Sequence, residues 1–243
     1  WAPLGEFPTP LEPMQKLGEA IGAGSIYVKR DDLSATNYGG NKVRKLEFSL
    51  AEAIAKGRKT IVTAGAVGSN HVLATTIHAR TLGLDTVGIF GPQPVQENLR
   101  TNILRNRHNG CRIEYVENMG QLPMHAARVY RREWREGNRP YLLYIGGSNT
   151  AGIVGYVEGG LEIARQVDQS MMPEPEYVFV PVGSSGTFAG MILGLKLAGL
   201  RSAVVGVRVA DKEVTNERVA AFMANRANKR LRRLDPSVPL VKT

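Results

Sequence analysis

Three short loops of this sequence combine glycines with hydroxyl or amide side chains, and each precedes a segment of helical period. They are residues 39–42 (GGNK), 65–71 (GAVGSNH) and 183–187 (GSSGT). Free backbone N–H groups at a helix start, together with the positive end of the helix dipole, bind phosphate or carboxylate groups, and glycine lets such a ligand approach the backbone. The three loops therefore predict a site for an anionic small molecule.

The third loop has the surroundings of a phosphate site, because it follows an apolar strand at 177–182 and precedes an apolar helix at 188–200. Its glycines do not form G-x-G-x-x-G, and no G-x-x-x-x-G-K-[ST] occurs in the chain, so the usual dinucleotide and P-loop fingerprints are absent. The alternative interpretation is an ordinary turn. The candidate phosphate ligands are Gly183, Ser184, Ser185, Gly186 and Thr187.

Lys42 stands in the first turn of a predicted helix, where the helix dipole disfavours a cation and should lower the pKa of the amine. A lysine with a lowered pKa has more free amine at neutral pH, and a free amine condenses with carbonyl groups to form a Schiff base. We therefore predict a reactive role for Lys42. We interpret Lys45 and Lys56 as ordinary exposed lysines.

The middle loop opens a second helix, and Ser69, Asn70 and His71 can present polar groups there to a substrate carboxylate. Ser69 can also be a simple helix cap. His71 and His78 fall on nearly one helical face, but they lack the further ligands of a metal site, so we predict that no metal is bound.

These loops must be positioned by alternating strands and helices, the pattern of α/β proteins with parallel sheets. An apolar stripe at Val43, Leu46, Leu50, Ala53 and Ile54 predicts a helix that starts near Asn41 and ends at Gly57. Further helices are predicted to start near Ser69, Val95, Gln121, Thr150, Thr187 and Val214. The predicted strands are 26–29, 60–63, 86–90, 112–116, 141–144, 177–182 and 203–209.

Five segments, taken in order, resemble the D-cysteine desulfhydrase and 1-aminocyclopropane-1-carboxylate deaminase family of fold type II pyridoxal-phosphate (PLP) enzymes. They are 26–33 (IYVKRDDL), 39–47 (GGNKVRKLE), 68–71 (GSNH), 146–149 with 155–158 (GGSN, GYVE), and 183–187. The resemblance covers about residues 9–206. Residues 146–149 are more similar to the desulfhydrase branch.

The resemblance implies that Lys42 carries PLP as a Schiff base and acts in catalysis with Ser69. It implies that Asn70 contacts the cofactor ring, that Ser69, Asn70 and His71 bind the substrate, and that residues 183–187 bind the phosphate. It implies two interleaved parallel-sheet lobes, a large one at 1–44 plus 150–243 and a small one at 45–149. Family chains continue through further βα units, so we expect this sequence to be a fragment that lacks its C-terminal part.

The composition fits this interpretation, since 43% of the 243 residues are hydrophobic and 22% are charged. With one cysteine and no apolar run long enough to cross a bilayer, we expect a cytoplasmic protein without a membrane partner. The net charge is +9, and the basic run at 228–233 has no interleaved aromatic residues, which argues against nucleic acid. We expect a homodimer acting on a small amino acid.

The predicted reaction is a PLP-dependent β-elimination on a D-cysteine-like amino acid, giving sulfide, ammonia and a 2-oxo acid. One alternative is ring-opening deamination of 1-aminocyclopropane-1-carboxylate. Another is a catalytically inactive module that binds the cofactor or a partner subunit.

Overall fold

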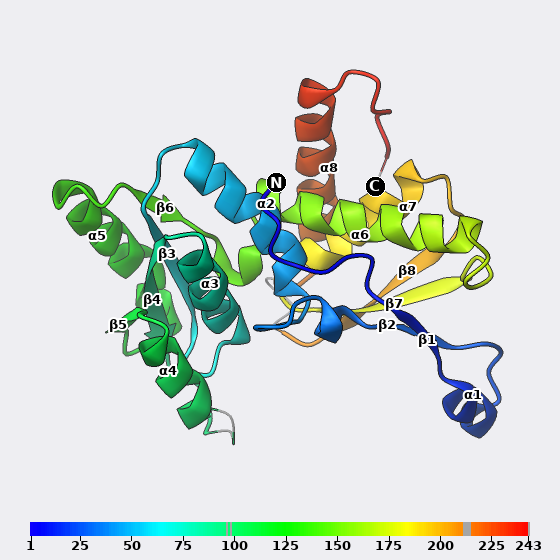
Figure 1. Cartoon of the computed structure of the whole chain (residues 1–243), viewed down its shortest axis with the longest axis horizontal. Helices are drawn as coiled ribbons and strands as arrows, with labels where there is room; N and C mark the ends of the chain where they lie inside the picture. The colour runs from blue at the N-terminus through cyan, green and yellow to red at the C-terminus, as the bar shows by residue number, and fades with distance from the viewer. Residues whose placement is uncertain (96, 98, 211–214, 243) are drawn as a thin grey trace.

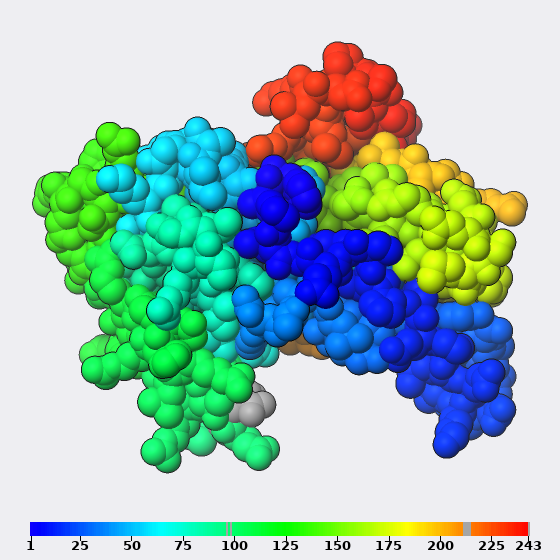
Figure 2. Space-filling model, in the orientation of Figure 1, coloured from blue at the N-terminus to red at the C-terminus, as the bar shows by residue number. Residues whose placement is uncertain are grey.

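The computed structural model describes all of the chain except residues 96, 98, 211–214 and 243. The elements form two groups around separate parallel sheets, with helix α2 (Lys42–Ala55) lying between them (Figure 1). In the space-filling view the N-terminal segment, in dark blue, crosses the front of the molecule between the two groups (Figure 2). Among the described residues, no helix combines the length and the apolarity needed to cross a lipid bilayer.

The first group is a four-stranded parallel sheet covered on both faces. Its strand order is β5 (Arg112–Tyr115), β4 (Asp85–Gly91), β3 (Thr60–Ala66) and β6 (Pro140–Leu142). On one face, Ile61 packs with apolar residues of α2 and α3 (Asn70–Thr81). On the other face, Val62 and Ala64 pack with apolar residues of α5 (Leu122–Arg135). The remaining elements of this group are α4 (Leu99–His108) and the 3₁₀ turns η2 (Met119–Gln121) and η3 (Ile145–Gly147).

The second group has a parallel pair of strands and three helices. Strands β7 (Tyr177–Val182) and β8 (Ala203–Arg208) pair in register along their whole length. The helices are α6 (Thr150–Asp168), α7 (Gly186–Leu197) and α8 (Glu217–Leu234), and α6, α7 and α8 share a buried apolar cluster. Because β7 leads directly into α7, the loop at 183–187 lies at the carboxyl end of a parallel strand, where α/β proteins bind ligands.

The N-terminal segment departs from the predicted parallel pattern. Strand β1 (Leu11–Pro13) pairs antiparallel with β2 (Tyr27–Lys29), and α1 (Gln15–Ile21) lies between them. We did not predict β1 or α1, because a three-residue strand that ends in proline has no alternating pattern long enough to recognise. The 3₁₀ turn η1 (Asp31–Leu33) then leads to the first glycine loop.

Helix α2 is the element that joins the two groups. The predicted stripe faces inward, with Val43, Leu46, Leu50 and Ala53 fully buried, whereas Ile54 is 44% exposed. The helix packs against both α3 and α6. Because it begins at Lys42, the predicted lobe boundary at residue 44 falls within its first turn. The division into lobes at 1–44 plus 150–243 and 45–149 remains a proposal.

The other predicted elements agree closely with the structure. All seven predicted strands are present, with ends shifted by at most a few residues. Helix α4 begins at Leu99 rather than near Val95, and helix α8 begins at Glu217. The predicted helix start at Val214 lies outside the described residues.

Candidate active site

Lys42 and the loop at 183–187 line one cavity of about 200 Å³, between the start of α2 and the start of α7. The Lys42 Nζ donates a hydrogen bond to the Asn41 Oδ1 at 2.8 Å. Burial lowers the pKa of Lys42 from 10.5 to about 8. The direction of the shift is the predicted one, but burial, rather than the helix dipole, is its cause.

The loop at 183–187 leaves room for an anion at the start of α7. Ser69 and Asn149 cap their helices with side-chain oxygens, but Ser185, in the left-handed conformation at φ 61°, makes no such bond to α7. A β-carbon on Gly183 would meet no atom within 4 Å, so the backbone there is open to the cavity. Uncapped N–H groups and an open glycine are the features that a phosphate group requires.

Lys45 lies in the same cavity, and our interpretation of it as an exposed lysine is wrong. Its side chain is among the most buried of the chain, at 1% exposed. The Nζ donates hydrogen bonds to the Gly146 carbonyl at 3.0 Å and to the Ser148 Oγ at 3.3 Å. Burial, and then the charge of Lys42, hold the pKa of Lys45 well below its usual value. Lys56, in contrast, is 52% exposed in its side chain and pairs with Glu52, as expected for a surface lysine.

Ser148 connects Lys45 to the loop at 183–187, and we did not single out Ser148 from the sequence. Its Oγ lies 2.7 Å from the Ser184 Oγ. Ser148 belongs to the 146–149 segment, where Gly146 and Gly147 both adopt positive φ angles and turn the chain after β6. The run of two glycines before Ser148 and Asn149 was the signal that could have identified it.

The start of α3 places Ser69, Asn70 and His71 in three different settings. Ser69 caps the helix by accepting from the Val72 N–H at 3.3 Å, which confirms its structural role. The Asn70 Oδ1 accepts from the Tyr38 hydroxyl at 3.2 Å and from the Asn102 amide at 2.9 Å. Because that oxygen is occupied, the amide nitrogen of Asn70 is the group left to face a ligand.

His71 is buried rather than open to a substrate. Its Nε2 lies 3.0 Å from the Thr63 Oγ1, and its Nδ1 has no hydrogen-bond partner among the described residues. Burial, and then the charges of Lys42 and Lys45, hold the pKa of His71 well below its usual value, so the ring is neutral. The same charges show that His71 lies near both lysines. Its direct contact with a substrate remains a prediction.

The arrangement fits PLP. Lys42 offers an amine of lowered pKa, the loop at 183–187 offers an open anion site, and Lys45 adds a second amine without a carboxylate partner among the described residues. Within the described part of the chain, no three His, Cys, Asp or Glu side chains group as metal ligands would.

Comparisons with known proteins identify the family. Residues 2–237 match the model of the pyridoxal-phosphate dependent enzyme family, and the chain belongs to that family. D-cysteine desulfhydrase of Serratia proteamaculans is 38% identical over 227 residues, which are 89% of this chain and 68% of that protein. A Pyrococcus abyssi protein, provisionally named 1-aminocyclopropane-1-carboxylate deaminase, is 37% identical over 87% of this chain and 63% of its own length. The chain thus spans about two thirds of these relatives.

Solved structures agree with this assignment. The crystal structure of an ACC deaminase homologue superposes with a TM-score of 0.83 at 30% identity, over 94% of this chain and 68% of that one. Diaminopropionate ammonia lyase of Escherichia coli, at 16% identity and a TM-score of 0.66, covers 90% of this chain and 63% of its own, and shows the shared fold. The predicted family, the α/β fold of type II PLP enzymes and the PLP cofactor are confirmed, and the relatives are PLP-dependent lyases and deaminases.

Proposed function

We propose that the chain carries the catalytic lysine and the phosphate site of a PLP-dependent lyase that eliminates sulfide from D-cysteine. The observation that carries this proposal is the shared cavity of Lys42 and the loop at 183–187, in a chain 38% identical to a D-cysteine desulfhydrase. The products would be sulfide, ammonia and a 2-oxo acid, with one water consumed.

Each residue has a proposed role. Lys42 holds PLP covalently, and the start of α7, together with Ser184, Ser185, Gly186 and Thr187, holds its phosphate. The Asn41 Nδ2 lies 3.5 Å from the Thr187 Oγ1 and links the two helix starts. When bound, PLP supplies an aldehyde that condenses with amines and a ring that delocalises the electron pair of a deprotonated α-carbon.

Lys42 also moves the proton. Once released from the cofactor, its Nζ accepts the proton from the α-carbon of the substrate. With a pKa of about 8, roughly a tenth of the Lys42 amine is unprotonated at pH 7, far more than for an ordinary lysine. Ser69 and the Asn70 amide lie at the start of α3, where the helix dipole favours a substrate carboxylate.

The competing reaction is ring-opening deamination of 1-aminocyclopropane-1-carboxylate, which the TM-score of 0.83 to an ACC deaminase homologue favours. The test has two steps. PLP is added to the purified chain, reduced onto the protein with borohydride and mapped, and we expect the label on Lys42. Sulfide release from D-cysteine is then compared with ammonia release from the cyclopropane amino acid.

A larger kcat/KM for D-cysteine supports the proposal, and a larger value for the cyclopropane substrate assigns the chain to the deaminase branch. A label on Lys42 with turnover of neither substrate supports the cofactor-binding module instead. A label on another lysine contradicts the site.

The expected oligomeric state, a homodimer, and the expected location, the cytoplasm, remain proposals. The exposed apolar side chains of Phe179, at 67%, and Val209, at 66%, support self-association at the β7–β8 sheet. Light scattering of the purified chain measures the oligomeric state.

A further inference from the structure

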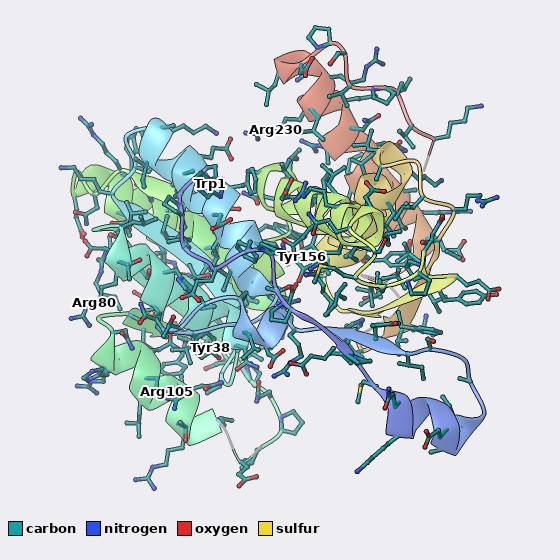
Figure 3. The ribbon with its side chains drawn as sticks, turned by 45° about the vertical axis from the view of Figure 1, so that its right-hand side comes forward. Trp1, Tyr38, Arg80, Arg105, Tyr156 and Arg230 are labelled. Atoms are coloured by element: carbon teal, nitrogen blue, oxygen red, sulfur yellow. The ribbon has the colours of Figure 1, made fainter. Side chains whose placement is uncertain are left out.

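A second cavity, of about 680 Å³, lies between the ends of α3 and α4, and it is lined by basic and neutral polar side chains. Arg80 comes from α3, Arg105 and His108 come from α4, and Tyr38 comes from the loop before α2. None of its lining residues is acidic. Figure 3 shows Tyr38, Arg80 and Arg105 together on this side of the first group of elements.

Arg80 and Arg105 differ from two other arginines of the first group of elements. Arg112 pairs with Glu133 and Arg132 pairs with Glu114. Among the described residues, neither Arg80 nor Arg105 has a carboxylate within salt-bridge distance. Arg80 donates to the His108 carbonyl at 3.2 Å, which ties the end of α3 to the end of α4 and leaves most of the guanidinium donors of Arg80 available.

Two arginines that line one cavity, with no acidic side chain among its described lining residues, favour an anion over a cation there. Arginine is well suited to this purpose, because its planar fork matches carboxylate and phosphate oxygens. The charge of Arg105 also reaches Tyr38, where it lowers the pKa of a phenol that burial raises. Tyr38 and Arg105 also line the same cavity.

The walls of this cavity also hold Asn70 of the candidate active site. The Tyr38 hydroxyl donates to the Asn70 Oδ1 at 3.2 Å, and Asn102 of α4 donates to the same oxygen at 2.9 Å. Asn102 also donates to the Gly68 carbonyl at 2.8 Å. Tyr38, which lines the cavity, and Asn102, which lies on α4 but does not line the cavity, thus together orient the Asn70 amide.

We propose that this cavity binds a small dianion, a dicarboxylate or a phosphate ester, between Arg80 and Arg105, and that occupancy there orients Asn70 through Tyr38. The cavity would then be a regulatory site that is separate from the Lys42 site. Binding of the dianion does not depend on the proposed elimination. The effect on Asn70 rests on the proposed PLP site.

The first experiment measures binding by calorimetry in PLP-loaded protein that has been reduced with borohydride, because the phosphate site near Lys42 is then filled. The probes are succinate and inorganic phosphate, with chloride at the same ionic strength as the control. We expect saturable binding of one equivalent of succinate or phosphate. Arg105→Gln and Arg80→Gln should each weaken it by about tenfold, as expected for a lost charge-assisted contact.

Arg107→Gln is the matched control, because Arg107 is an exposed arginine of α4 that does not line the cavity. It should leave the affinity within about twofold. Absence of saturable binding overturns the proposal, and so does an equal loss in Arg107→Gln and Arg105→Gln, which would mean general charge attraction. The relative affinities of succinate and phosphate distinguish the two sources of the dianion.

The second experiment tests the link to Asn70 in unreduced PLP-loaded protein. We expect succinate to shift the visible absorption of the cofactor, and Tyr38→Phe to lose that shift when both proteins are compared at saturating succinate. No shift in the parent protein, or a shift that persists in Tyr38→Phe, overturns the proposed link. Either outcome leaves the PLP label on Lys42 unaffected, so failure of the link is distinct from failure of the proposed function.

Discussion

Two buried regions meet on helix α2, and they differ in the groups that accept hydrogen bonds from their positively charged side chains. Arg44 faces the N-terminal segment and α6, where its guanidinium donates to Glu162 at 2.8 Å and to Asp31 at 2.9 Å. Lys42 and Lys45 face the cavity of the candidate active site, where, within the described part of the chain, their hydrogen-bond acceptors are neutral oxygens of Asn41, Gly146 and Ser148.

The pKa values follow this difference. Burial opposes the charge of Arg44, but its hydrogen bonds to Glu162 and Asp31 raise its pKa above the usual value. Burial lowers the pKa of Lys42, and no carboxylate of the described residues offsets it. A buried cation with its own carboxylates is held as part of the structure, whereas a buried amine without one can accept a negatively charged ligand.

The largest effect is expected for Lys42→Ala, which removes the amine that binds PLP covalently. The absorption band of the lysine-bound cofactor near the visible edge should disappear. Lys56→Ala removes an exposed lysine of the same segment and should retain the band, measured at equal PLP concentration. Retention of the band in Lys42→Ala would show that another amine, with Lys45 the nearest candidate, carries the cofactor.

The next largest effect should be on stability, and it tests the buried region around Arg44 and Glu162. Glu162→Gln keeps the shape of the side chain but leaves Arg44 and Lys29 without their buried partner, and should lower the free energy of unfolding by about 3–5 kcal/mol. Glu158→Gln breaks an exposed pair with Arg165 on the same helix and should cost less than about 1 kcal/mol. Urea unfolding measures both, and equal losses would contradict the distinction between the two regions.

The free energy of unfolding should depend on pH because the pKa of Lys42 is lowered in the folded protein. The pKa of Lys42 is about 8 in the folded protein and 10.5 in the unfolded chain, so between these values only the unfolded chain binds the proton. The free energy of unfolding of the cofactor-free protein should therefore rise with pH from about 8 upward, by up to about 3 kcal/mol at completion.

The control for this pH dependence is a pair of variants. Lys42→Met should reduce the rise but not abolish it, because the pKa of Lys45 is also lowered and Lys45 keeps its own contribution. Lys56→Met should keep the full rise, when urea unfolding is followed from pH 7 to pH 10. An identical rise in the parent protein and in Lys42→Met would mean that Lys42 does not carry a lowered pKa.

Part of the site could be predicted because glycine loops at strand ends are visible in the sequence. The pattern of Lys42 after two glycines and the loop at 183–187 after an apolar strand identified two parts of the candidate site, which share one cavity in the structure. Lys45 could not be distinguished from Lys56 in this way, because burial of a polar residue depends on what packs over it. The turn at 146–149, a hundred residues away, supplies that cover.

Contacts between residues that are distant in the sequence also decide the surroundings of His71. The helix start at residue 70 was visible, but the orientation of His71 depends on Thr63 of β3, which approaches only in the folded sheet. Strand β1 was missed because it is three residues long and ends in proline. Strand β6 is equally short, but it overlaps the apolar run at 141–144, which could be recognised locally.

The smallest expected effect tests whether the phosphate of PLP lies against the backbone of Gly183. Gly183→Ala places a β-carbon where no atom of the described residues lies within 4 Å, so folding should be normal, but the methyl group enters the cavity that the phosphate needs. PLP binding should weaken by about tenfold, or about 1.4 kcal/mol. Gly186→Val is the less informative variant, since a β-carbon at Gly186 would lie 2.3 Å from the Ser148 Oγ and would disturb the Lys45 contacts as well.

Gly24→Ala is the matched control for Gly183→Ala, because a β-carbon there also meets no atom within 4 Å and no cavity of the site is involved. Titration of PLP, followed by absorbance, gives the dissociation constants of the three proteins. If Gly183→Ala binds PLP as tightly as Gly24→Ala, the phosphate does not lie against the backbone of residue 183. Lys45 and Ser148 would then be the next groups to test, because the Ser148 Oγ contacts the Ser184 Oγ of the loop and the Lys45 Nζ contacts the Ser148 Oγ.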